Sequence, residues 1–180
     1  MARVIFVLFL ALSLSGCYNP LNRATADRYG QTCREAQATG QLAVAEEACR
    51  RALINVRIGH LGDEAESQEL YNLGRVKRQI GKYEEAEELH KESLKIQESL
   101  SPPDQAKIGR RLAEIAIAIG EQGRVKDAWP FLVRLIPIAD LYSGQERFVV
   151  KGLFEFYAKV YQKLGMQVEA TQLLEKAKTL

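Results

Sequence analysis

The sequence predicts an all-α protein built from one repeated helix–turn–helix unit. Strong helix formers (Ala, Leu, Glu, Lys, Arg and Gln) dominate its 180 residues, and no long stretch alternates between apolar and polar residues. With 47% hydrophobic and 27% charged residues, the composition is typical of a globular protein. A glycine followed five residues later by alanine recurs at spacings of 41, 42 and 42 residues, at Gly40, Gly81, Gly123 and Gly165. A fixed period of this length predicts a stacked repeat array.

The first residues have the pattern of a bacterial export signal. An apolar run of 11 residues extends from Val4 to Leu14. It is too short to cross a bilayer, which takes ~20 residues, but is typical of the apolar region of a signal peptide. The following Leu14-Ser15-Gly16-Cys17 resembles the bacterial lipobox. The resemblance implies that residues 1–16 are removed and that Cys17 is acylated on its sulfur and amino group. The alternatives are an ordinary signal peptide with a chance cysteine, or an uncleaved membrane anchor.

Acylation implies attachment to a membrane of the bacterial cell envelope. Several acyl chains on one cysteine hold a protein stably, whereas one chain alone is marginal. In Gram-negative lipoproteins an aspartate after the cysteine favours the inner membrane. Tyr18 stands there in this sequence, which implies the outer membrane, facing the periplasm, where the organism has one. Residues 17–24 are expected to form a lipidated tether.

Residues 62–102 contain the clearest copy of the repeat. Its first half carries Leu70-Tyr71-Asn72-Leu73-Gly74, and its second half carries Gly81-Lys82-Tyr83-Glu84-Glu85-Ala86-Glu87, then Leu94 and Ser101-Pro102-Pro103-Asp104. These residues resemble the tetratricopeptide repeat (TPR) in its longer, kinesin-light-chain-like class. The resemblance implies a right-handed superhelical solenoid of four TPR units. The units are expected at about 25–61, 62–102, 103–143 and 144–180.

Local signals predict where individual helices begin and end. Asp63 and Asp104 are expected to cap the first helices of the second and third units. The second helix of the third unit is expected over 125–141, with a kink or a late start at Pro130. Gly74 and Ala86 are expected to be small because two helices meet closely there.

Two cysteines are expected to face each other in the first unit. Cys33 falls at the position that corresponds to Gly74, and Cys49 lies one turn after Ala45. An oxidising periplasm favours a disulfide between them. The alternative is a pair of buried thiols that pack as small apolar residues.

No motif for catalysis or cofactor binding is present. The chain has no Gly-rich phosphate loop, Gly-x-Ser-x-Gly or His-Glu-x-x-His. His60 and His90 have no cysteines or carboxylates around them at metal-site spacing. We therefore expect no enzyme activity, no cofactor and no metal. The net charge of +2 argues against a nucleic-acid partner. The pair Glu87-Glu88 is expected on a solvated helix face.

The expected partner site is the concave wall, because the resemblance implies that the first helix of each unit lines it. The candidate groove residues are Arg34, Tyr71, Asn72, Arg75, Arg78, Gln79, Arg110 and Lys159. In the resembled class, an asparagine at the place of Asn72 bonds a peptide backbone. The arginines predict a basic groove suited to a segment with carboxylates. The alternative is that they only solubilise a helix face.

A second surface departs from the repeat. Pro130, Phe131 and Val133 occupy outward positions that are mostly charged in the preceding unit. They predict an apolar patch that docks a partner, another copy or the lipid surface, unless the C-terminal residues cover it. An apolar end that supports a homo-oligomer is expected from Val168, Leu173 and Leu180.

The sequence thus predicts a lipid-anchored, non-enzymatic scaffold that binds a partner protein or peptide in the cell envelope, for assembly or stability of an envelope complex. Two alternatives stay open. One is a structural, self-associating subunit, and the other is a regulatory accessory subunit of an envelope enzyme.

Overall fold

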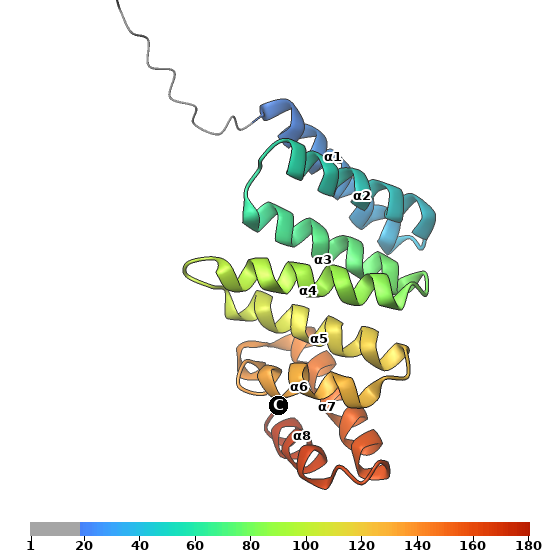
Figure 1. The fold of residues 1–180 in the computed structure, drawn as a ribbon, viewed down its shortest axis with the longest axis vertical. Coiled ribbons are helices and arrows are strands. Elements are labelled where there is room, and N and C mark those ends of the chain that lie inside the picture. Colours follow the sequence, from blue (N-terminus) through green and yellow to red (C-terminus); the bar gives the residue numbers. More distant parts are fainter. Residues whose placement is uncertain (1–18) are drawn as a thin grey trace, which may run out of the picture.

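The computed structural model describes residues 19–180, in which helices stack one after another along the long axis (Figure 1). Two short 3-10 helices, η1 (Val125–Ala128) and η2 (Ala139–Leu141), flank α6. The α-helices are α1 (Pro20–Ala38), α2 (Leu42–Ile58), α3 (Asp63–Gln79), α4 (Tyr83–Ser99), α5 (Gln105–Glu121), α6 (Trp129–Leu135), α7 (Gly144–Lys163) and α8 (Gln167–Thr179).

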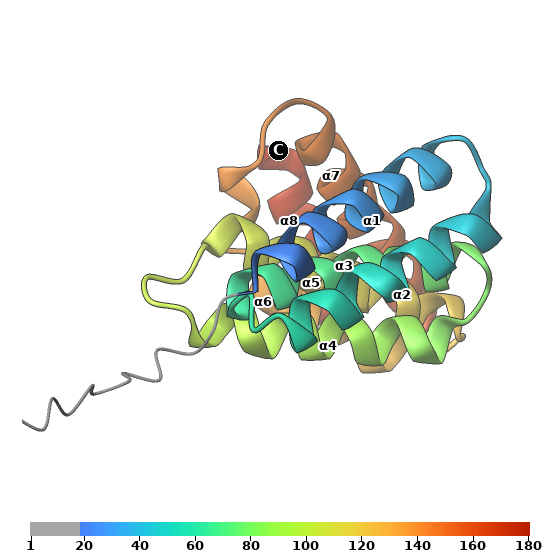
Figure 2. The ribbon, with the colours of Figure 1, turned by 90° about the horizontal axis from the view of Figure 1, so that it is seen from above.

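The α-helices pack as four successive pairs, α1 with α2, α3 with α4, α5 with α6 and α7 with α8. Seen from above, α2 and α4 lie along one side of the stack, and α1 and α7 lie along the other (Figure 2). A single pair cannot bury its own apolar faces, so each pair depends on its neighbours. The predicted fold class, an all-α solenoid of four helix–turn–helix units, is confirmed.

The recurring glycines close the first helix of every pair in the same way. Gly40, Gly81, Gly123 and Gly165 have φ of 73°, 80°, 76° and 77°, in the left-handed region that glycine enters without steric cost. In the second pair, the Gly81 N–H donates to Arg78 O (3.0 Å) and the Lys82 N–H donates to Lys77 O (2.9 Å). The other three turns repeat this hydrogen-bond pair, which satisfies carbonyls that the helix end leaves free.

The alanine five residues after each glycine lies at the seam between the helices of a pair. Ala45, Ala86, Ala128 and Ala170 are all buried. Gly74 is small because α4 approaches α3 closely there, as predicted, and the side chain that lies against it is that of His90. A Cβ at Gly74 would lie 2.7 Å from His90 Cε1, so the imidazole fills the space that a side chain would need.

The first helix begins earlier than the sequence predicted. Residues 20–24, expected in the tether, are the first turn of α1, because the Asn19 side chain caps this turn by accepting from the Leu21 N–H at 3.0 Å. Pro20 suits the first turn, since its missing N–H would have no helical partner there. The predicted signal peptide and the lipidation site Cys17 lie outside the described residues.

Two other predictions about helix ends had different outcomes. Asp104 caps α5 as expected, and its Oδ1 accepts from the Lys107 N–H at 3.0 Å. Asp63 does not cap α3. It is the first helical residue, and Gly62, with a φ of 93°, is the N-cap. Asp63 still has a favourable place, because a carboxylate in the first turn opposes the helix dipole.

The second helix of the third unit is broken, contrary to the continuous helix expected over 125–141. Pro130 lies in the first turn of α6, which gives the late start that was the other expectation. The seven-residue α6 ends before Pro137, and η2 follows after a turn. Proline disrupts a helix interior because it lacks an N–H and clashes with the preceding turn.

Two hydrophobic clusters form the core, and a layer of buried polar residues lies where α3, α4 and α5 meet. The N-terminal cluster includes Cys33, Ala45, Cys49, Leu53, Leu70, Leu73 and Val76. The C-terminal cluster includes Leu112, Ile115, Ile119, Leu132, Leu135, Phe154, Tyr157, Tyr161 and Leu173. The buried polar residues are Ser67, Asn72, Glu87, His90, Ser93, Gln97 and Arg111.

Glu87 belongs to this buried set and not to a solvated face as expected. Its carboxylate lies 2.7 Å from Lys91 Nζ and 2.9 Å from Arg124 Nη1. Burial acts to raise the pKa of Glu87, but hydrogen bonds from Lys91 and Gln122, with the charge of Arg124, hold it below its ordinary value. Glu87 thus ties α4 to the turn that precedes η1.

The two cysteines of the first unit pair as a disulfide that joins α1 to α2. The Cα atoms of Cys33 and Cys49 are 5.1 Å apart, within the range that a disulfide spans. Both residues are fully buried.

We predict that Gly74→Ala destabilises the protein by about 1–3 kcal/mol, because the new methyl group must displace His90 in a packed interior. Gly152→Ala is the matched control. Gly152 lies within α7 and a Cβ there meets no atom within 4 Å, so alanine should raise the free energy of unfolding by up to about 1 kcal/mol. Urea unfolding of both variants measures the difference; equal effects would contradict the proposed role of His90.

We also predict that reduction of the Cys33–Cys49 bond lowers the free energy of unfolding by roughly 3 kcal/mol, the loop-entropy contribution for cysteines 16 residues apart. Urea unfolding with and without reductant measures this loss. The Cys33→Ala/Cys49→Ala variant is the control, since reductant should leave its stability unchanged. Mass spectrometry after alkylation tests the bond directly, and two free thiols in the exported protein would contradict it.

Candidate functional site

A hollow of about 280 Å³ opens where α3, α5 and α7 lie side by side. We call it the groove hollow. It is lined by Tyr71 and Arg75 from α3, Arg110, Ala113, Glu114 and Ile117 from α5, Tyr142, and Gln145, Glu146, Val149 and Val150 from α7. Three predicted groove residues, Tyr71, Arg75 and Arg110, therefore meet at one site.

The groove hollow is lined by charged side chains of both signs, two arginines and two glutamates. Arg110 donates from Nε to Glu146 Oε1 at 2.6 Å and from Nη2 to Oε2 at 3.1 Å, a two-pronged pair that fixes both side chains. These bonds hold the pKa of Glu146 below its ordinary value. Arg75 has only a loose contact, with Nε 3.8 Å from Glu114 Oε1. Arg75 is thus the cation of this hollow with most capacity to bond a ligand.

The prediction of a basic groove is wrong for Arg78, because carboxylates of α5 pair with it. Arg78 donates to Glu114 Oε2 at 3.0 Å and to Glu121 Oε1 at 3.2 Å. Its charge therefore binds α3 to α5 and is not offered to a partner. Since Arg78 does not line the hollow, its role in this structure is to join two repeats.

Arg111 lies behind Tyr71 and is 1% exposed. It donates to Ser93 Oγ at 2.8 Å, to Lys107 O at 2.9 Å and to Ser67 Oγ at 3.1 Å. Its guanidinium carbon lies 5.0 Å from the centre of the Tyr71 ring, a cation–π geometry. Burial lowers the pKa of Arg111, but arginine stays protonated in proteins. Its hydrogen bonds within residues 19–180 all go to neutral oxygens, so a positive charge without a carboxylate lies behind the hollow.

His90 is the second buried ionisable group in this region. Its ring centre lies 5.6 Å from that of Tyr71, and Nε2 is 4.0 Å from Glu114 Oε2. Neither ring nitrogen has a hydrogen-bond partner among the described residues. Burial, together with the charges of Arg78, Arg111 and Arg75, lowers the pKa of His90 to about 3. The imidazole is therefore neutral at physiological pH.

The other predicted groove residues do not line the hollow. Asn72 is buried, and its amide bonds Gln68 and Glu69 on its own helix, so the expected bond to a partner backbone is not available. Gln79 accepts from Gln37 Nε2 at 3.0 Å, which bridges α1 and α3. Arg34 of α1 and Lys159 of α7 are exposed but do not line the hollow.

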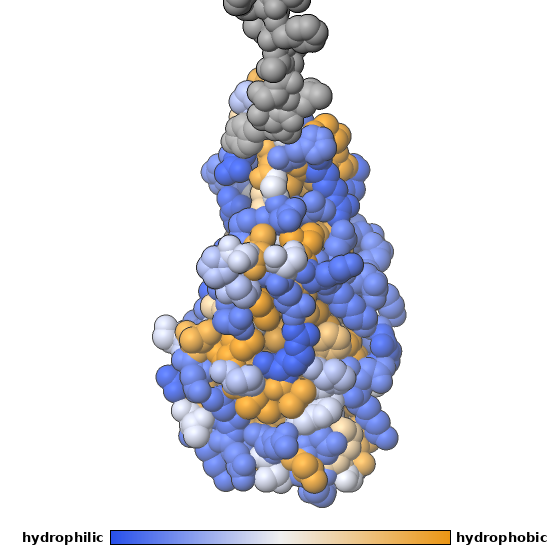
Figure 3. All heavy atoms as spheres, turned by 60° about the vertical axis from the view of Figure 1, so that its left-hand side comes forward, coloured by the Kyte–Doolittle hydropathy of each residue, from blue (hydrophilic) through white to orange (hydrophobic). Residues whose placement is uncertain are grey.

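The three residues of the predicted convex patch are not all exposed. Pro130 and Val133 are exposed, but Phe131 is half-buried and packs against the C-terminal cluster. Val133 borders a shallow hollow of about 470 Å³ with residues of α8. The expected apolar end is likewise reduced to Val168, because Leu173 is buried in the core and Leu180 is partly buried against the C-terminal cluster. Apolar side chains gather instead over the lower, C-terminal half of the face in Figure 3.

Sequence reasoning missed several residues of the site. Glu146, Val149 and Val150 line the hollow. They were not recognised because they do not occupy the positions of the first helix that the repeat pattern assigns to the groove. Tyr142 lies between η2 and α7, where no repeat position exists. Arg111 carried a usable signal: it lies four residues before Ile115, on the inward side of α5.

No group of three or more His, Cys, Asp or Glu side chains in residues 19–180 is placed to hold a metal ion. Over the same range, no helix is long and apolar enough to cross a membrane.

We predict that His90 makes stability depend on pH. Between pH 6.5 and 3 the unfolded chain binds a proton at this imidazole and the folded chain does not. The free energy of unfolding therefore decreases by about 1.4 kcal/mol for each unit by which the pH is lowered in this window. At pH 5 the loss relative to pH 6.5 is about 2 kcal/mol. His90→Gln should lack this component, so the difference in unfolding free energy between wild type and variant should shrink from pH 7 to pH 5. The exposed His60→Gln is the control; a pH-independent difference for His90→Gln would contradict the prediction.

Comparison with known proteins agrees with this architecture. A family described as tetratricopeptide repeat matches residues 70–106. A putative kinesin light chain with nearly identical TPR-like repeats from Podosopora anserina is similar in structure, with a TM-score of 0.63 and 22% identity over 93% of this chain and 78% of that chain. BtubC (BKLC) from P. vanneervenii has a TM-score of 0.74 and 18% identity over 88% of this chain and 63% of that chain. No curated protein has significant sequence similarity to this chain.

At these identities the structural matches show the fold alone. Together with the family match to the second unit, they show that this chain has a tetratricopeptide repeat and folds as a solenoid of the kind seen in kinesin-light-chain-like TPR proteins.

Proposed function

We propose that this chain is a lipid-anchored TPR scaffold of the bacterial cell envelope. It binds a partner protein or peptide in the groove hollow, and the binding assembles or stabilises an envelope complex. TPR proteins generally act as non-catalytic scaffolds that bind other proteins. The lipobox-like Leu14-Ser15-Gly16-Cys17 supports the anchor, and Tyr18 after the cysteine supports the outer membrane, facing the periplasm.

The observation that carries the proposal is the combination of surfaces in the groove hollow. Ala113, Ile117, Val149 and Val150 give it an apolar lining, which suits a buried side chain of a partner. Arg75, with its loose ion pair, lies in the same hollow. The fixed charge of Arg111 lies behind Tyr71 and adds to the positive potential. We therefore expect a segment that inserts one apolar side chain and places a carboxylate next to Arg75.

Self-association is the second candidate, and exposed aromatics on α7 favour it. Phe148 is 70% exposed and Phe156 is also exposed. They lie four residues on either side of Gly152, on one side of the helix. A second copy could cover this stripe, in which case Phe148→Asp would abolish the oligomer and leave binding in the groove intact.

We predict that two changes in the groove hollow weaken partner binding about tenfold each, the loss expected for a central contact of an interface. Val149→Asp places a carboxylate in the apolar lining, and Arg75→Ala removes the available cation. A photo-crosslinking residue at position 149, introduced in the native cells, first identifies the partner. Binding of that purified partner to each variant then gives the affinity.

Phe148→Asp is the matched control for this experiment. It adds the same charge one residue away, at a position that does not line the hollow, and should bind the partner as the wild type does. Wild-type affinity for both Val149→Asp and Arg75→Ala would refute binding in the groove hollow.

A further inference from the structure

The outer side of α2 is an exposed surface of the first helix pair. Val44, Glu47, Arg51, Ile54 and Ile58 follow one another at spacings of three and four residues, so they share one side of the helix. The opposite side of α2 holds the buried residues that face the core. Arg51 joins this side to α1 by donating to Tyr29 Oη at 2.9 Å. We call this surface, together with Leu21 at the start of α1, the N-terminal end face.

The N-terminal end face exposes several large aliphatic side chains. Leu21 is 76% exposed and Ile58 is 66% exposed, and Val44 and Ile54 are exposed as well. A shallow hollow of about 420 Å³ between Tyr29, Val44 and Arg51 continues this surface. The equivalent positions of α4, 41 residues on, are also exposed, but they carry Glu85, Glu88, Glu92, Lys95 and Ser99. The first unit therefore has apolar side chains where the second unit has mostly charged ones.

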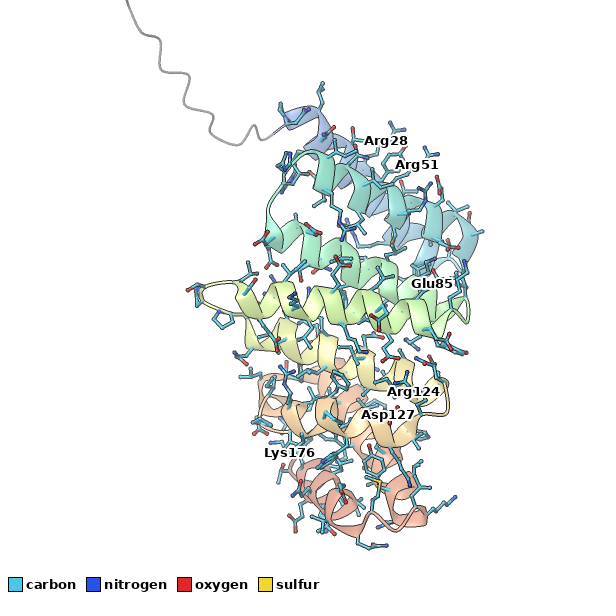
Figure 4. The ribbon with its side chains drawn as sticks, in the orientation of Figure 1. Arg28, Arg51, Glu85, Arg124, Asp127 and Lys176 are labelled. Atoms are coloured by element: carbon cyan, nitrogen blue, oxygen red, sulfur yellow. A yellow bond between two sulfur atoms is a disulfide. The ribbon has the colours of Figure 1, made fainter. Side chains whose placement is uncertain are left out.

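The charged residues of this face carry an excess of arginine. Arg50 and Arg51 both bond the single carboxylate of Glu47, at 2.8 and 2.6 Å. Figure 4 shows Arg28 at the same end of the stack as Arg51. Exposed aliphatic side chains next to arginines are the chemistry that binds the interface of an anionic bilayer.

The position of the proposed lipid site brings a bilayer to this face. Pro20, the first residue of α1, is only three residues after Cys17, a distance of at most about 11 Å for an extended chain. The Asn19 N–H donates to Gly59 O at 3.4 Å, which fixes the start of the described chain beside the end of α2. Leu21 and Ile58 therefore lie next to the point from which the acylated residue is reached.

We infer that the N-terminal end face docks on the lipid surface. Ile58 and Leu21 enter the interface between head groups and acyl chains, and Arg28, Arg50 and Arg51 face anionic head groups. The inference rests on the proposed acylation of Cys17. It adds an orientation: the outer side of α2, and not only the acylated residue, lies against the membrane.

Fluorescence quenching tests this orientation in the full, acylated chain. Trp129 is the single tryptophan of the sequence, and Trp129→Phe removes its signal. In that background, Ile58→Trp reports on the end face. Val168→Trp is the matched control, because Val168 is 68% exposed, aliphatic and located on α8 at the far end of the stack. Each protein is reconstituted in vesicles of phosphatidylethanolamine and phosphatidylglycerol, with and without bromine on the acyl chains.

Brominated lipid should quench Ile58→Trp and leave Val168→Trp unchanged, and replacing phosphatidylglycerol by phosphatidylcholine should reduce the quenching. Equal emission of Ile58→Trp with and without bromine would overturn the inference. That result together with a dimer in detergent would identify a second copy as the occupant instead. Mass spectrometry of the N-terminal peptide separates the two proposals: an unmodified Cys17 refutes the anchor and the docking together, whereas an acylated Cys17 without quenching refutes the docking alone.

Discussion

The glycine that closes the first helix of each pair is the constraint on which the architecture depends. A φ near +75° reverses the chain within a few residues, and the hydrogen-bond pair across the turn holds that reversal. Since the same geometry recurs at every pair, each second helix starts from an equivalent place. The buried alanine five residues later then lets the two helices of a pair approach closely. The regular stack, and the side-by-side placement of α3, α5 and α7, follow from this repetition.

Within this regular frame, equivalent positions have come to serve different purposes. Asn72, Glu114 and Phe156 are spaced by the 42-residue period. Asn72 is buried and bonds its own helix, Glu114 pairs with Arg75 and Arg78 of α3, and Phe156 is exposed at the last unit. The repeat therefore determines where a side chain lies, and the neighbouring unit determines whether it is a link between repeats or a free surface. The groove hollow forms where these links leave Arg75 only loosely paired.

The sequence was sufficient to predict the helical pairs, their turns and the facing positions of Cys33 and Cys49, because these depend on local residues and a fixed period. It was insufficient for the groove, since ion pairs between repeats neutralise arginines that look free in the sequence. Arg78 and Arg110 are the clear examples, as each bonds a carboxylate on the next first helix. The broken helix of the third unit was only partly foreseen. Pro130 indicated its late start, but its early end before Pro137 was not predicted.

The buried charge of Arg111 bears on what the groove can hold. Replacing water by protein around a cation is costly unless polar atoms compensate, and Ser67, Ser93 and the Lys107 carbonyl supply that compensation. These partners are neutral, so they solvate the charge without cancelling its field. Tyr71, stacked on Arg111, separates this field from the hollow by the thickness of one ring. A carboxylate next to Arg75 would therefore meet one cation directly and a second through Tyr71, whereas an ammonium group would meet repulsion from both. On the proposed function, this arrangement selects acidic segments even though the ion pairs at the surface of the groove are nearly balanced.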